Sequence, residues 1–191
     1  RSVGRGGHVY RGQCAGEVRR QPHRPARDAG NRSGDGHHRA GRMDLGPAPL
    51  RRDGVETMDL LLDDFRMGYG ATNRTLVARM IGRMGDLHVR DYAMGVHTED
   101  SYDLYFMMWR ELLRLAPIGF VAPIACIVAA MAYEGGDGAL AQKALDRALA
   151  DDEHYPLASL LRRVFNAGWP PESFAAMRAE LHPKVIASIF E

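Results

Sequence analysis

The stretch GGDGALAQKALDRALADDEHYPLASLL, residues 135–161, decides the fold class. It contains a glycine turn, an alanine- and leucine-rich segment with helical spacing, an acidic break and the start of another helix. Tetratricopeptide arrays repeat such units about every 34 residues. At that distance upstream and downstream lie YDLYFMMWRELLRL and PPESFAAMRAE, which lack the glycine turn. We therefore predict one tetratricopeptide-like helical pair at residues 120–150, not an array.

Short amphipathic segments surround this pair. The clearest prediction is a helix over residues 100–115, capped by Asp100 and stopped by Pro117, because its apolar residues recur every three or four positions. Other helices are predicted from about residue 56, after a cap at Thr72 or Asn73, and after the caps Asp86 and Asp137. Prolines are expected to open the helices at residues 156 and 171, and a last helix is expected from His182.

No segment alternates apolar and polar residues as a half-buried strand does. We therefore predict an all-α domain, a compact bundle of about eight short helices spanning residues 56–191. The apolar stripes predict its core residues: Trp109, Leu112, Ile124, Ile127, Val128, Leu145, Leu149, Leu160 and Leu161.

Residues 116–133 carry no formal charge, and this length approaches that of a membrane span. Two prolines and a glycine interrupt the segment, so a helix begun near Pro123 is too short to cross a bilayer. We predict a buried central helix and no membrane association. The two cysteines form no disulfide framework, which is typical of a protein of the reducing cytoplasm.

Residues 1–55 differ from the rest in composition. Residues 1–56 carry twelve arginines, no lysine and six acids, a net charge of +6, whereas residues 57–191 carry −5. Large aliphatic residues are almost absent from the first fifty, so we predict a disordered basic arm. An arm of this kind can bind nucleic acid through phosphates or serve as a plain solvated tail.

A third interpretation of the arm fits its composition better. The chain begins with Arg and accumulates Arg, Gly, His, Pro and Ala, as GC-rich DNA does when it is translated in the wrong frame. We therefore hypothesise that residues 1–55 are frame-shifted or that the sequence is truncated.

The segments VRDYAM (89–94), WREL, GDGALA, YPLASLL and GWPPESF occur here in an order that resembles a bacterial family called domain of unknown function 4192. The resemblance covers about residues 73–178 and corresponds to the C-terminal half of the family. Members carry an α/β portion at the N-terminus, and residues 1–50 do not resemble it. The resemblance implies a helical fold and no known activity.

The helical region contains no nucleophile elbow, phosphate loop, H-E-x-x-H or C-x-x-C motif, so we predict no catalytic, cofactor or metal residues. Arg90 and Asp91 are the one candidate functional pair, with a structural ion pair as the alternative. The acids and imidazole of residues 97–103 are explained by helix capping, with a metal site as the alternative. We interpret GGDG (135–138) as a turn with a helix cap, with phosphate binding as the minor alternative.

The predicted function is a non-catalytic helical domain for protein interaction or structural support, without a cofactor. Its expected partner is an unknown protein or a missing N-terminal domain. The main alternative is the remnant of an enzyme whose catalytic α/β half is absent, with Arg90 and Asp91 closing the site. Nucleic-acid binding through the basic arm is a weaker alternative.

Overall fold

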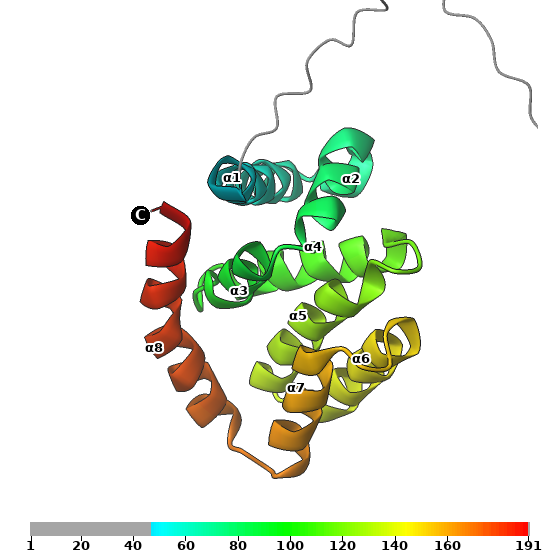
Figure 1. Cartoon of the computed structure of the whole chain (residues 1–191), viewed down its shortest axis with the longest axis vertical. Coiled ribbons are helices and arrows are strands. Elements are labelled where there is room, and N and C mark those ends of the chain that lie inside the picture. Colours follow the sequence, from blue (N-terminus) through cyan, green and yellow to red (C-terminus); the bar gives the residue numbers. More distant parts are fainter. Residues whose placement is uncertain (1–46, 191) are drawn as a thin grey trace, which may run out of the picture. The chain divides into compact units, whose positions relative to one another are not determined.

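The computed structural model describes residues 47–190, and every regular element in this part of the chain is helical (Figure 1). The elements are α1 (Pro47–Arg66), the short 3-10 helix η1 (Gly70–Thr72), α2 (Arg74–Arg83), α3 (Leu87–Gly95), α4 (Tyr102–Leu115), α5 (Val121–Glu134), α6 (Gly138–Asp151), α7 (Pro156–Asn166) and α8 (Pro171–Phe190). The all-α prediction is confirmed. The arm was predicted to be disordered over residues 1–55, and residues 1–46 of it lie outside the described part of the chain.

The helical pair α5–α6 forms the centre of the core. Twelve of the fourteen residues of α5 are buried, from Val121 to Ala132, because this helix is apolar on every side. Helix α6 turns Ala141, Ala144 and Ala148 toward the core, and such small side chains allow two helices to approach closely. The predicted pairing of helices at residues 120–150 is confirmed.

Most predicted core anchors lie where the apolar stripes place them. Trp109 and Leu145 are fully buried, Leu161 is nearly so, and Leu149 is half-buried against the core. The prediction for Leu160 is wrong, because 47% of this residue is exposed. The apolar stripe of α7 is wider than the surface that α7 packs against. Five methionines are fully buried and fill the irregular contacts between helices: Met58, Met80, Met84, Met108 and Met131.

The uncharged segment at residues 116–133 consists of a loop followed by α5. A helix of fourteen residues spans about 21 Å at about 1.5 Å per residue, short of the roughly 30 Å of a bilayer core. Among the described residues, no helix combines the length and apolar character needed to cross a membrane. The prediction of a buried central helix is confirmed.

The start of α5 is capped by a residue from the end of α6. The Asp151 carboxylate accepts hydrogen bonds from the backbone N–H groups of Gly119 (2.6 Å), Val121 (2.9 Å) and Ala122 (3.0 Å). A carboxylate at a helix N-terminus satisfies unpaired donors and interacts favourably with the helix dipole. Asp151 therefore closes the α5–α6 pair at the end opposite its connecting turn.

Local side-chain caps define three of the other helix starts. As predicted, the side chains of Asn73, Asp86 and Asp137 accept hydrogen bonds from the first turns of α2, α3 and α6. The prediction for Asp100 is wrong, because α4 begins at Tyr102 and Ser101 occupies the cap position. The Ser101 hydroxyl accepts a hydrogen bond from Thr98 N–H over 2.9 Å, so it closes the preceding turn instead of capping the helix.

Two helices are longer than predicted. Helix α1 begins at Pro47, so residues 47–55, which the sequence assigned to the arm, are helical. They pack on α3, where Gly54 leaves room for Val89; a Cβ at Gly54 would lie 2.8 Å from a Val89 methyl. Helix α8 continues through Pro183, although two helices were expected there. Pro183 is exposed, so water can hydrate the carbonyl that its missing N–H leaves unpaired.

Candidate functional site

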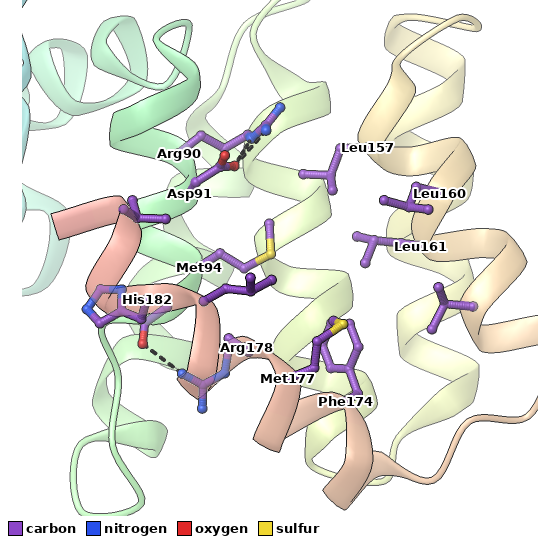
Figure 2. Close-up of a pocket in the computed structure, with 14 residues that line it drawn as sticks. Arg90, Asp91, Met94, Leu157, Leu160, Leu161, Phe174, Met177, Arg178 and His182 are labelled. Atoms are coloured by element: carbon purple, nitrogen blue, oxygen red, sulfur yellow. Dashed lines mark hydrogen bonds and ion pairs between the residues drawn. The ribbon is translucent and has the colours of Figure 1, made fainter. Parts of the chain in front are cut away.

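Arg90 and Asp91, the pair indicated by the sequence, lie on α3 at one end of a groove (Figure 2). Arg90 Nε and Nη2 donate to Asp91 Oδ1 over 2.8 and 2.6 Å, and Arg90 Nη1 donates to the Tyr155 hydroxyl over 3.2 Å. Burial lowers the pKa of Arg90, but the hydrogen bonds to Tyr155 and Asp91 outweigh it and raise the pKa. The guanidinium is thus engaged within the fold and ties α3 to the residue that precedes α7.

An apolar groove extends from this pair between α7 and α8, with α3 along its floor. This α7–α8 groove has a cavity volume of about 320 Å³. Its walls are formed by Leu157, Leu160 and Val164 of α7 and by Met177, Leu181 and Val185 of α8. Figure 2 shows the leucines of α7 on the right, Met94 of α3 on the left and Met177 of α8 below them. Volume and lining both lie in the range of ligand-binding clefts.

Each wall exposes one leucine to solvent. Leu160 and Leu181 are each 47% exposed, although their helices are consecutive in the chain. Consecutive helices usually bury their apolar stripes against each other. Here α7 packs on α5 and α6, whereas α8 packs mainly on α3 (Figure 1). Their facing apolar sides are therefore left partly uncovered.

The start of α8 is fixed by aromatic rings. Tyr133 of α5 stacks on Phe165 of α7 with centroids 3.9 Å apart. Phe174 of α8 meets both rings edge-on, at 5.9 and 5.7 Å. Edge-to-face contacts of this kind add to the stabilisation from buried area. They anchor the first turn of α8 where the groove ends.

Three basic side chains, here called the basic cluster, lie near one another: His97, Arg178 and His182. Two of them, His97 and Arg178, contact the Glu134 carboxylate, and Arg178 and His182 also line the groove. Arg178 Nε donates to Glu134 Oε1 over 2.7 Å, and Arg178 Nη1 donates to the Gly95 carbonyl over 2.7 Å. The His97 ring faces the other Glu134 oxygen, with Nε2 3.2 Å away. The side chains of His97, Glu134 and Arg178 are 3%, 8% and 13% exposed, so the Arg178–Glu134 ion pair and the His97 ring meet in a desolvated setting.

His182 lies inside α8 and not at a helix start, which corrects the sequence prediction. Its ring packs on Gly95, where an added Cβ would lie 2.4 Å from Nδ1, and its centroid is 5.3 Å from that of Tyr92. Within the described residues Nδ1 is buried and makes no hydrogen bond. Burial lowers the pKa of His182, and the charges of Arg178 and His97 lower it further.

A polar cleft of about 570 Å³ shares Arg178 with the groove. It includes His97, Glu99 and Asp103 of the segment 97–103, for which the sequence left a metal site open, together with Glu134 and Glu172. Asp103 and Glu172 lie in the first turns of α4 and α8, where the helix dipole accounts for them. Within residues 47–190, no three His, Cys, Asp or Glu side chains are arranged to hold a metal ion.

The remaining sequence candidates are structural or exposed. The GGDG turn joins α5 to α6, and its Asp137 caps α6. The backbone N–H of His154 donates to the Asp152 carboxylate, while its ring is exposed. Trp169 is 43% exposed, and its backbone carbonyl accepts a hydrogen bond from the Tyr133 hydroxyl.

Sequence reasoning did not identify the basic cluster. Glu134 and Arg178 are separated by 44 positions, and helical periodicity gives no information on such pairings. A usable signal was present on α8, because Arg178 and His182 are four residues apart and therefore share one helix face. A second signal was Glu134, the charged residue that ends the otherwise apolar helix α5.

The comparisons with known proteins support the resemblance found in the sequence. A family model described as "Domain of unknown function (DUF4192)" matches residues 10–172. This match extends further toward the N-terminus than the expected range of 73–178, and it ends at the second residue of α8. No curated protein and no solved structure matches the chain.

Proposed function

Because the chain belongs to the DUF4192 family, whose description assigns no activity, we propose a function from geometry: the chain is a protein-interaction domain whose α7–α8 groove binds an amphipathic helix. The observation that carries this proposal is the pair of facing apolar walls with half-exposed leucines. Single exposed leucines are ordinary, but contiguous apolar surface lining a hollow is typical of binding sites.

A helix is the occupant that suits this groove best. The domain already packs one helix, α8, along α3, so the adjoining surface has the shape that helices fit. Leucine, valine and methionine walls accept apolar side chains spaced every three or four residues along a helix. Methionines such as Met94 and Met177 adapt to different side-chain shapes.

The charges beside the groove favour an acidic partner. The charged residues of α7 are Arg162 and Arg163, and this helix has no acid. Arg162 is paired with Asp146 of α6, which leaves the exposed Arg163 for a partner. A partner helix with glutamate or aspartate on its polar side therefore matches the α7 wall.

The test uses a labelled helical peptide with leucines on one face and glutamates on the other, titrated into the full chain by fluorescence anisotropy. Leu160→Glu places a charge on the apolar wall and is expected to weaken binding by about tenfold or more. Leu60→Glu is the matched control, because Leu60 is a 51% exposed leucine on α1 outside the groove. It is expected to bind like the unmodified chain.

Two results would contradict the proposal. One is the absence of saturable binding of the glutamate peptide by the full chain. The other is equal weakening of binding by Leu160→Glu and Leu60→Glu, which would show that the peptide does not use the groove. A peptide with lysines in place of the glutamates tests the charge argument, and it is expected to bind more weakly.

A further inference from the structure

Helix α8 is held less firmly than the other long helices of the described chain. Only Phe174 and Ile189 are buried among its twenty residues. Pro183 interrupts its hydrogen-bond ladder, and nearly all of α8 lies beyond the family match, which ends at residue 172. Beyond the aromatic anchor at Phe174, two residues connect the middle of α8 to its neighbours. Arg178 contacts α5 and α3, and His182 contacts α3.

Arg178 brings a positive charge to a place where protonation of His182 would add a second one with little compensation. Arg178 takes one oxygen of Glu134, and His97 faces the other. His182 is packed on Gly95 and Tyr92, and its buried Nδ1 has no acceptor among the described residues. A second positive charge at His182 would therefore lie beside Arg178 without a carboxylate of its own, which is unfavourable in a desolvated site.

We propose that residues 178–190 of α8 form a pH-sensitive wall of the α7–α8 groove, and that protonation of His182 releases this wall from α3. Phe174 stays in its aromatic contacts and serves as the pivot. The consequence for binding rests on the proposed function, since a groove without its α8 wall holds a partner helix less tightly. The release of α8 itself does not depend on that function.

The direction of the effect follows from proton linkage. The pKa of His182 is lowered in the docked state by burial, Arg178 and His97, so the released state binds protons more readily. Docking is therefore fully favoured above the ordinary histidine pKa of about 6.5 and weakens as the pH falls below it.

Other charged groups near His182 do not reverse this direction. On α3, Asp91 is committed to Arg90, and Tyr92 is neutral in this range because burial and Asp59 of α1 raise its pKa. Arg52 of α1 binds the carbonyl of Phe190 at the far end of α8. The part of α7 that lines the groove is apolar.

The experiment is an NMR titration of the full chain from pH 7.5 to 5.0 without peptide. We expect the amide signals of residues 178–190, Tyr92 and Gly95 to change together with the His182 ring, with a midpoint below pH 6.5. His182→Gln should keep α8 docked throughout, and His154→Gln should behave like the unmodified chain, because the His154 side chain is 88% exposed.

Two outcomes would overturn the proposal: residues 178–190 that stay unchanged while the His182 ring titrates, or the same transition in His182→Gln. If His182→Gln does not fold, the NMR titration of the unmodified chain still tests the proposal. The affinity for the glutamate peptide is expected to fall with pH by about tenfold per unit at most, the limit for one coupled proton. Absence of binding at pH 7.5 would refute the proposed function alone, because the NMR titration contains no peptide.

Discussion

Helices α5 and α8 both contact several other helices, yet they are held in different ways. Helix α5 buries its first twelve residues among apolar neighbours and is capped by Asp151. Helix α8 buries two residues of twenty and relies on an aromatic anchor, the Arg178–Glu134 ion pair and the packing of His182. Apolar burial is insensitive to pH, whereas desolvated charges respond to it. We therefore expect α5 to be the rigid part of this domain and α8 to be the part that can adjust.

The largest expected effect compares two buried isoleucines. Ile127 in α5 and Ile189 in α8 are 0% and 2% exposed. Ile127→Ala is expected to lower the global free energy of unfolding by about 3 kcal/mol, because it leaves a cavity in the core. Ile189→Ala is expected to lower it by less than about 1 kcal/mol, since α8 can detach while the remaining helices stay folded. Urea denaturation measures both, and equal losses would break the comparison.

The second prediction concerns the cap of α5. Asp151→Ala removes the acceptor for three backbone N–H groups and is expected to cost about 2 kcal/mol of global stability. Asp146→Ala on the same helix is the control. Its surface pair with Arg162 is worth less than about 0.5 kcal/mol. If the two substitutions cost the same, Asp151 has no special role in holding α5.

The third and smallest effect should be confined to α8. Gly95→Ala places a Cβ against the His182 ring and is expected to weaken α8 docking by about 1–2 kcal/mol, while the unfolding of the remaining helices is nearly unchanged. Hydrogen exchange of residues 178–190 should become about tenfold faster. Gly82→Ala on α2 is the control, because its added methyl meets no atom within 4 Å. Slower exchange of α8 in Gly95→Ala would contradict the contact with His182.

The sequence was sufficient for the parts of the fold that depend on local pattern. Helical spacing placed α4 to α7, and short polar residues marked the caps at Asn73, Asp86 and Asp137. Periodicity identifies the apolar side of a helix, but it does not say how much of that side a neighbour covers. Leu160 was therefore assigned to the core although it lines a groove.

Contacts between distant residues could not be predicted in this way. The Arg178–Glu134 pair and the cap of α5 by Asp151 join positions about thirty or more residues apart. A new helix was expected to begin at His182, next to Pro183, but an exposed proline inside a helix leaves the unpaired carbonyl accessible to water, and α8 continues. The pair Arg90–Asp91 was found from the sequence, and the structure places it at the end of the groove.

The most direct test is native-state hydrogen exchange of the full chain at pH 7.5 over a series of denaturant concentrations below the unfolding transition. We expect the amides of α5 to exchange only through global unfolding, with a strong dependence on denaturant. Residues 178–190 should exchange through a local opening of lower free energy that depends little on denaturant. Exchange of residues 178–190 with the same free energy and the same denaturant dependence as α5 would contradict the account.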